Sequence, residues 1–364
     1  MSKKINQVEP NISLQDAQKV NDYMSSGAWI TEHALTKELE EKIADFVGRK
    51  YAVAVPNGTI AIYLSLLAAG LTEGKRVAVP NITMIATINA ILWAGAEPVI
   101  IDLNERLCMS LKSLQTVDKL DGVIYVPLNG RTEDGIAIEN YCNEKNIILI
   151  EDSAHALGSR YQDKMCGSLG GLSIFSFTPH KIITMGQGGL VLTDDDNFYE
   201  YLISLKTFNR SKDKSDWHEG FGLNFKITDL QSALGLSQFE KINEFIKVKK
   251  EMFQIYKSDI ESHNLNFINF FEYETPWFVD LICESEPDRY YYKGVLEKDN
   301  ILTRESYPAL SKQSFLQSIE KTNLEFSENI SENILWLPSS TNLTKDQIDE
   351  VSNSIAIFSA EKDL

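Results

Sequence analysis

The sequence predicts an α/β fold in which a doubly wound, mainly parallel sheet is followed by a smaller α+β region. Between about residues 50 and 195, short apolar runs rich in β-branched residues alternate with stretches of helical periodicity. Such continuous apolar runs are typical of strands buried on both faces of a parallel sheet. After residue 224 the alternation ends, and a long amphipathic stretch leads into mixed strand and helix patterns. A chain of 364 residues has room for one large domain and a smaller one.

The predicted strands follow one another at regular intervals along this region. We expect them to end at Val55, Val79, Asp102, Pro127 and Asp152. Helical periodicity follows the first, second and fourth of them, over 59–71, 83–95 and 133–145. The amphipathic stretch 227–260 predicts one or two helices. We place the large domain at 1–245, including an N-terminal segment 1–35, and the small domain at 246–364.

The composition argues against several classes of partner. The formal net charge is −17 and the isoelectric point about 4.8, so the surface repels nucleic acid phosphates. No stretch approaches the roughly 20 apolar residues of a membrane helix, and the N-terminus lacks the apolar core of a signal peptide. The four cysteines are scattered without a CxxC pair, which disfavours a metal site and a disulfide framework. We expect a cytoplasmic protein in a reducing compartment, with no membrane or nucleic acid partner and no metal.

Ligands of open α/β sheets bind beyond the carboxyl ends of the strands. After the first strand, Gly58 and Thr59 begin a helix and could offer free N–H groups to a phosphate, although a plain strand–turn–helix with a cap explains them as well. After the fifth strand, Asp152 is either a helix N-cap or an acid paired with a buried cation such as a protonated ring nitrogen. His155 lies three residues further on and could share that site or serve only as a structural hydrogen-bonding group.

Lys181 follows the apolar run 172–177, with Ser176 and Thr178 close by in the sequence. A lysine partly desolvated at the end of a strand has a lowered pKa and could attack an aldehyde. The alternative is a lysine that extends from the rim of the sheet into water. The glycines of "GQGG" (186–189) allow a close backbone approach, but they match neither the dinucleotide fingerprint nor the P-loop.

Taken together, these features describe one ligand. A phosphate at Gly58 and Thr59, a protonated ring nitrogen at Asp152 and an aldehyde at Lys181 are the parts of pyridoxal 5′-phosphate. The sequence therefore predicts an enzyme that uses this cofactor.

Sequence blocks spread over nearly the whole chain resemble the DegT/DnrJ/EryC1/StrS family of sugar aminotransferases. They occur in the family's order: "NGTIAIYLSLLAAGL", "PNITMIATINAILWAGAEPVIID", "IEDSAHALGS", "GSLGGLSIFSF", "GQGGLVLTDD" and "GLNFKITDLQSALGLSQFEKI". "TRESYPAL" and "LPSSTNLTKDQIDEV" are similar to its small-domain motifs. The resemblance implies the aspartate-aminotransferase fold (pyridoxal phosphate fold type I).

The resemblance also implies which residues contact the cofactor. Lys181 resembles the lysine that bonds covalently to the cofactor and later moves the proton between the donor Cα and the cofactor, and Asp152 resembles the acid at the ring nitrogen. Asn224 resembles an asparagine that reaches the phosphate from the neighbouring subunit of a homodimer. Met84 stands where an aromatic residue usually covers the ring. The implied cofactor-binding set is Gly58, Thr59, Met84, Asp152, His155, Ser176, Lys181 and Asn224.

The same resemblance implies the substrate and the reaction. Trp29, Arg304 and Tyr307 are expected near the substrate. L-glutamate is the expected amino donor, and a keto-sugar nucleotide the acceptor. "VPNGT", "KIIT" and "NFKITDLQ" are similar to perosamine-type enzymes, which act on 4-keto-6-deoxyhexoses during the synthesis of amino sugars for surface polysaccharides such as O-antigen. Two alternatives are a pyridoxal phosphate-dependent 3-dehydratase, in which histidine replaces the lysine, and a cofactor-binding regulatory protein. The intact Lys181 and Asp152 favour transamination.

Overall fold

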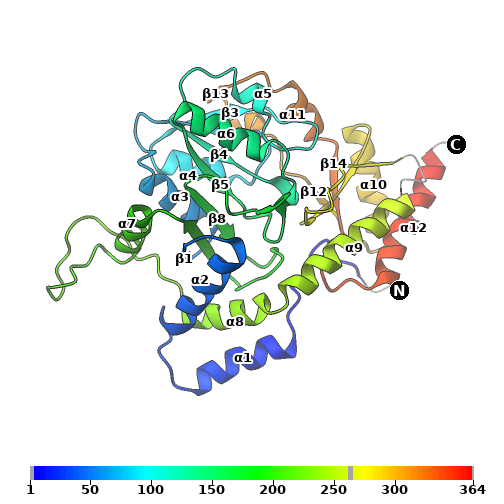
Figure 1. Ribbon diagram of the computed structural model, residues 1–364. Helices are drawn as coiled ribbons and strands as arrows, with labels where there is room; N and C mark the ends of the chain where they lie inside the picture. Colours follow the sequence, from blue (N-terminus) through cyan, green and yellow to red (C-terminus); the bar gives the residue numbers. More distant parts are fainter. Residues whose placement is uncertain (1–3, 261–264, 363–364) are drawn as a thin grey trace.

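The largest feature of the molecule is an eight-stranded sheet (Figure 1). The computed structural model describes residues 4–260 and 265–362. Neighbouring strands are parallel except at β9, which is antiparallel to both β1 and β8. The prediction of a mainly parallel sheet is therefore confirmed. In spatial order the strands are β1 (Tyr51–Val55), β9 (Gly189–Thr193), β8 (Leu172–Ser176), β5 (Ile148–Asp152), β4 (Gly122–Tyr125), β2 (Arg76–Pro80), β3 (Glu97–Ile101) and β13 (Glu320–Lys321).

Helices cover both faces of this sheet because successive side chains of a strand point to opposite sides. In β1, Val53 and Val55 pack with α3, α4 and α7, whereas Ala52 and Ala54 pack on the other face with α2 and α8. Both faces are therefore apolar, as expected for a doubly wound sheet. The helices of this region are α1 (Leu14–Ser25), α2 (Ala34–Val47), α3 (Gly58–Ala68), α4 (Ala86–Trp93), α5 (Leu111–Leu114), α6 (Gly135–Lys145), α7 (Asp196–Lys206) and α8 (Asp229–Phe239).

A second, antiparallel sheet lies in the C-terminal part of the chain (Figure 1). The long helix α9 leads into it and packs against α12 around a separate apolar core. The stretch 227–260 thus forms two helices, α8 and α9. The elements of this part are α9 (Ile242–Ile260), α10 (Glu286–Lys298), α11 (Glu325–Ile330), α12 (Lys345–Lys362), β10 (Asn266–Phe267), β11 (Val279–Ile282), β14 (Ile334–Leu337) and β12 (Arg304–Glu305), and a two-stranded hairpin of the first part is formed by β6 (Arg160–Tyr161) and β7 (Lys164–Met165).

The two sheets are tied together by segments distant in sequence. β13 leaves the C-terminal part and pairs with β3 at the edge of the large sheet. Conversely, Ile5 pairs with the backbone beside Ile301, where its N–H donates to the Asn300 carbonyl at 3.0 Å. Between the sheets, Trp277, Phe278 and Trp336 pack against apolar side chains of the large-sheet loops. The domain boundary between residues 245 and 246 stays a prediction. Residues of each predicted domain pair with strands or backbone of the other.

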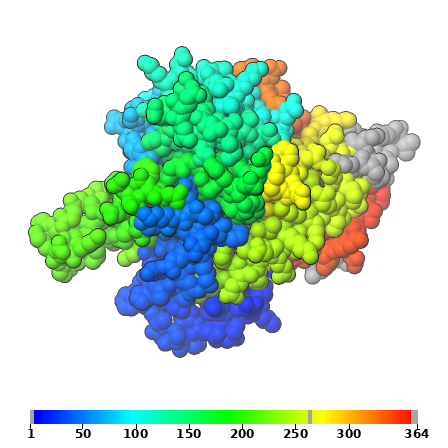
Figure 2. All heavy atoms as spheres, viewed as in Figure 1, coloured from blue at the N-terminus to red at the C-terminus, as the bar shows by residue number. Residues whose placement is uncertain are grey.

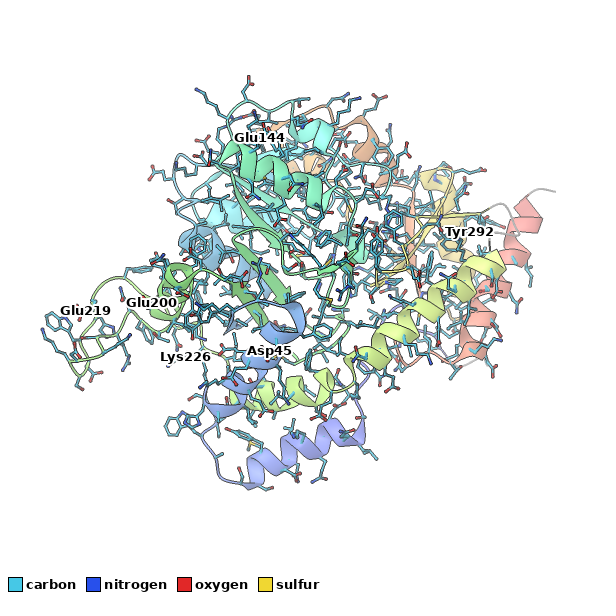
Figure 3. The ribbon with its side chains drawn as sticks, in the orientation of Figure 1. Asp45, Glu144, Glu200, Glu219, Lys226 and Tyr292 are labelled. Carbon is cyan, nitrogen blue, oxygen red and sulfur yellow. The ribbon has the colours of Figure 1, made fainter. Side chains whose placement is uncertain are left out.

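The segment between α7 and α8 projects away from the body of the molecule (Figures 1 and 2). Glu219 lies near its far end and Lys226 nearer its base (Figure 3). Its two sides are held by isolated bridges between Thr207 and Asn224 and between Arg210 and His218. Within the residues that the structure describes, no helix is both long and apolar enough to cross a membrane.

Candidate active site

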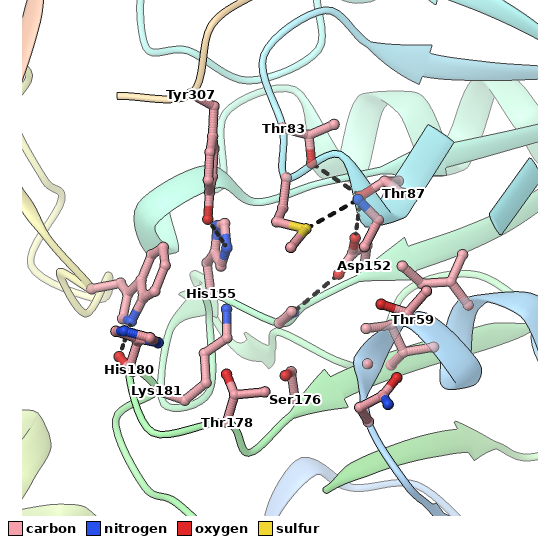
Figure 4. A pocket seen from close by; sticks show the side chains of 18 of the residues that line it. Thr59, Thr83, Thr87, Asp152, His155, Ser176, Thr178, His180, Lys181 and Tyr307 are labelled. Carbon is pink, nitrogen blue, oxygen red and sulfur yellow. Dashed lines mark hydrogen bonds between the residues drawn. The ribbon is translucent and has the colours of Figure 1, made fainter. Parts of the chain in front are cut away.

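All but two of the site residues predicted from the sequence line one pocket (Figure 4). The pocket has a volume of about 350 Å³ and lies at the carboxyl ends of β5 and β8, beside the N-terminus of α3. The exceptions are Trp29 and Asn224, which are exposed and do not line it. Asn224 lies at the base of the projecting segment, and Trp29 lies in the connection between α1 and α2.

The first turn of α3 forms one end of the pocket. Asn57 caps this helix, since its side-chain oxygen accepts a hydrogen bond from Ile60 N at 3.0 Å. Gly58 and Thr59 follow, and N–H groups of a first turn have no partner inside the helix. A Cβ atom on Gly58 would lie only 2.9 Å from Cβ of Ser176, so the site requires glycine. Free amides, a hydroxyl and the positive end of a helix dipole suit a phosphate group.

Two adjacent acids at the end of β5 have different environments because they point to opposite faces of the strand. Glu151 is fully buried, and its carboxylate accepts hydrogen bonds from four donors: Ser153 Oγ, Tyr161 OH, Gly167 N and Leu169 N. Asp152 faces the pocket, where Oδ2 accepts a 2.8 Å hydrogen bond from Thr87 and Oδ1 a 3.3 Å bond from Ala154 N. Burial raises the pKa of Asp152 against the opposing effects of Thr87 and of the Lys181 amine. A protonated ring nitrogen would supply the positive partner that this carboxyl needs.

Lys181 enters the pocket from the turn that follows β8, where its backbone N–H donates to the Thr178 carbonyl at 3.0 Å. Its Nζ lies 4.2 Å from the ring centroid of Trp277. Burial lowers the pKa of Lys181 well below the usual lysine value; Asp152 opposes this shift, and Arg304 adds to it. An amine of this kind is unprotonated often enough near neutral pH to act as a nucleophile or proton acceptor.

His155 lies beside the lysine and is neutral, because burial holds the pKa of its imidazole well below the usual value, with the positive charges of Lys181 and Arg304 adding to the effect. Its ring stacks on Trp277 with centroids 4.0 Å apart, and Nε2 lies 3.5 Å from the hydroxyl of Tyr307. Within the described residues, Nδ1 is buried without a hydrogen-bond partner. That nitrogen is available to an oxygen of a bound ligand.

The mouth of the pocket carries the remaining predicted residues. Arg304 is exposed, and its guanidinium lies 5.7 Å from the ring of Tyr307. Met84 is 43% exposed, and its sulfur accepts a hydrogen bond from Ala86 N at 3.0 Å. The sequence reasoning missed Trp277 and Thr87. Thr87 lies three residues after Met84, within one helical turn, and this spacing could have indicated it.

The pocket and the fold define a class of protein. A doubly wound sheet with an amine of lowered pKa, a buried acid and a helix N-terminus around one cavity is the arrangement of a pyridoxal phosphate-dependent enzyme of the aspartate-aminotransferase fold. The chain belongs to the DegT/DnrJ/EryC1/StrS aminotransferase family, whose model matches residues 10–356.

Similar proteins agree with this assignment over the full length. GDP-perosamine synthase of Escherichia coli O157:H7 is 32% identical, with 97% of this chain and 98% of that protein aligned. GDP-perosamine synthase of Vibrio cholerae is 31% identical over 95% and 97% of the two chains. The solved structure of Helicobacter pylori PseC, an aminotransferase of pseudoaminic acid biosynthesis, superimposes with a TM-score of 0.92 at 22% identity and covers 99% of this chain and 100% of that one. The protein is a pyridoxal phosphate-dependent aminotransferase of this family.

Proposed function

We propose that this aminotransferase transfers the amino group of L-glutamate to the ketone of a nucleotide-linked 4-keto-6-deoxyhexose. The observation that carries the proposal is the convergence of Lys181, Asp152 and His155 on one pocket beside the N-terminus of α3. Two relatives named GDP-perosamine synthase align over nearly their whole length and support a GDP-linked sugar as the first acceptor to test. We place the product in surface polysaccharides such as O-antigen.

The pocket residues divide the work of holding pyridoxal phosphate. Gly58, Thr59 and Ser176 would bind its phosphate, Asp152 its ring nitrogen and His155 its ring oxygen, while Met84 would cover the ring. When bound, the cofactor supplies an electron sink for the donor carbon. Lys181 takes the proton from the donor Cα, and its lowered pKa lets it do so near neutral pH. Arg304 and Tyr307 bind the substrates at the mouth.

We infer further that the active unit is a homodimer with shared sites. Asn224 and Trp29 do not line the pocket of their own chain, yet both resemble residues near the ligands of the family. The projecting segment also exposes Trp217 at 52% and Phe221 at 74%. Large exposed aromatic side chains favour contact with another protein, and two-fold dimers are the commonest assembly. A dimer would carry Asn224 of one copy to the phosphate site of the other.

The cysteines support a cytoplasmic location for this enzyme. Cys108, Cys142 and Cys166 are buried and form no disulfide within the described residues. Buried free thiols are typical of proteins in reducing compartments.

The test is a product analysis with a defined donor and acceptor. With L-glutamate and a GDP-linked 4-keto-6-deoxyhexose, we expect 2-oxoglutarate and a nitrogen-containing sugar in equal amounts by mass spectrometry. Release of 2-oxoglutarate with a deoxygenated, nitrogen-free sugar would establish the dehydratase instead. Binding of cofactor without turnover of any keto sugar would favour a regulatory protein. Lys181→Ala should abolish turnover, because its amine is the group that moves the proton.

A further inference from the structure

Trp277 is immobilised at every polar group that it has. Its backbone N–H donates to the Asn129 carbonyl at 3.0 Å, and its indole N–H donates to the His180 carbonyl at 2.7 Å. Its own carbonyl accepts a 2.6 Å hydrogen bond from Nζ of Lys249. The ring is 4% exposed and stacks on both His155 and Phe278. Such a residue presents a fixed aromatic surface to the pocket.

Lys249 is a buried lysine of an unusual kind. It lies in α9, is 4% exposed, and Nζ donates to the carbonyls of Trp277 and Ser339. In the part of the chain that the structure describes, no carboxylate forms an ion pair with it. Burial of an amine without a counter-ion destabilises the folded state, so an apolar residue at this position would give a more stable protein unless the two carbonyls require a hydrogen-bond donor. One of these two carbonyls belongs to Trp277, whose ring lies against the amine of Lys181.

The amine of Lys181 lies 4.2 Å from the centroid of the Trp277 ring, within the range of a cation–π interaction. The other charged or titratable groups around this amine are Asp152 of β5, His155 after β5, His180 beside it in sequence and Arg304 of β12. Asp152 favours the charged amine, and Arg304 opposes it. Trp277 adds a second favourable contact, which is an electron-rich face rather than a charge.

We propose that Trp277 holds the amine of Lys181 whenever that amine is free and stabilises the positive charge it gains in the reaction, and that Lys249 is the positioning residue that keeps Trp277 in place. This inference rests on the proposed role of Lys181. The bond that breaks is Cα–H of the donor, the bond that forms is N–H on Lys181, and the electron pair stays with the donor carbon. The ammonium so formed lies on the Trp277 face, within reach of the pocket.

The test measures the pKa of the Lys181 amine in cofactor-free protein, so that it does not depend on turnover. Acetic anhydride labels only the unprotonated amine, and peptide mass spectrometry of Lys181 between pH 6 and 10 gives its pKa. Trp277→Leu keeps the site apolar but removes the ring, and we expect the pKa to fall by about 0.5 to 1.5 pH units. Trp277→Phe keeps a weaker aromatic face, so the pKa of Lys181 should fall less in this variant. Equal falls in the two variants, or none, would overturn the role of the ring.

The direction in which Lys249→Met shifts the pKa of Lys181 distinguishes two effects. Loss of a nearby positive charge alone would raise the pKa of Lys181, whereas displacement of Trp277 lowers it. We expect a fall, and no further fall when Lys249→Met is added to Trp277→Leu. A rise, or fully additive falls, would show that Lys249 does not act through Trp277. Lys206→Met is the control for removal of a buried lysine outside this pocket; Lys206 donates to the Ala54 carbonyl and, unlike Lys249, also pairs with Glu32 and Glu40.

A separate measurement distinguishes failure of this inference from failure of the proposed role of Lys181. Pyridoxal phosphate with borohydride should mark Lys181 in the wild-type protein. If it does, and the pKa of the Lys181 amine is the same in the Trp277 variants as in the wild type, only the role of Trp277 is wrong. If borohydride marks another lysine, the role of Lys181 itself is wrong.

Discussion

Thr87 donates a 2.8 Å hydrogen bond from Oγ1 to Oδ2 of Asp152, joining the first turn of α4 to the end of β5. Thr83 lies 3.1 Å from the Thr87 hydroxyl and continues the chain. The bond lowers the pKa of Asp152 against the effect of burial and keeps one oxygen of the carboxylate oriented. The acid that would face the cofactor ring is therefore oriented by a side chain of helix α4 as well as by its own strand β5.

Removal of this bond should weaken cofactor binding. Thr87→Val preserves the shape of the side chain and removes the donor, so Asp152 is less readily ionised. We expect the dissociation constant of pyridoxal phosphate, measured by absorbance titration, to rise by roughly tenfold. Thr193→Val is the control, because that buried threonine of β9 donates to the Gly171 carbonyl outside the pocket and its loss should leave the constant unchanged. Equal affinities of Thr87→Val and wild type would show that the bond does not matter.

Loss of the Asp152 carboxylate should impair the enzyme more than loss of its hydrogen bond from Thr87. Asp152→Asn replaces the anion by a neutral amide that cannot balance a cationic ring nitrogen. We predict a fall in turnover of about 100-fold or more, measured from 2-oxoglutarate release. Asp102→Asn changes the acid that follows β3, which lies outside the pocket and bonds to Ser327 N. That variant should keep nearly full activity, and a similar loss in both would point to misfolding rather than chemistry.

The close approach of Gly58 to Ser176 makes a third prediction. Gly58→Ala should force the two segments apart, since the new Cβ would lie 2.9 Å from Cβ of Ser176. We expect weaker binding of pyridoxal phosphate by about tenfold or more in the same titration, with little change for pyridoxal, which has no phosphate. Gly294→Ala, in the middle of α10 with open space around it, should instead raise the unfolding free energy by about 0.5–1 kcal/mol.

Lys249 should make stability depend on pH in a defined direction. Burial lowers its pKa from 10.5 to about 7, so the unfolded chain binds the proton more tightly than the folded protein. The cost of burial is complete below pH 7 and disappears as the pH rises toward 10.5. Wild-type unfolding free energy should therefore rise relative to Lys249→Met by up to about 1.4 kcal/mol per pH unit in this window. Urea unfolding at pH 7 and pH 9 measures the difference; a constant difference would contradict the prediction.

Complementation tests the shared site. Lys181→Ala and Asn224→Leu should each be inactive alone. If Asn224 acts in the other copy, an equal mixture of exchanging subunits regains about one quarter of wild-type activity, because half the dimers contain one intact site. If it acts within its own chain, every site keeps one lesion and no activity returns. Size-exclusion chromatography must first show that both variants are dimers that exchange subunits.

The sequence predicted the elements whose pattern is local. The runs ending at Val55 and Asp152 are strands with those ends, and the groups just beyond them meet in one pocket because parallel strands present the same ends together. Trp277 could not be found this way. It precedes a strand of the other sheet, and only tertiary packing brings it against His155, 122 residues earlier in the chain. β13 was missed because two charged residues carry no strand periodicity.

The pairing of Ile5 with the backbone beside Ile301 and of β13 with β3 constrains how the chain folds during synthesis. The segment around Ile5 must wait for a partner near residue 301 to be synthesised, and β3 keeps an unpaired edge until residues 320–321 emerge. An open strand edge invites pairing with other chains. A nascent chain that has not yet reached residues 301–321 is therefore the form most prone to aggregation. Expression of fragments that end near residue 245 should accordingly yield insoluble protein.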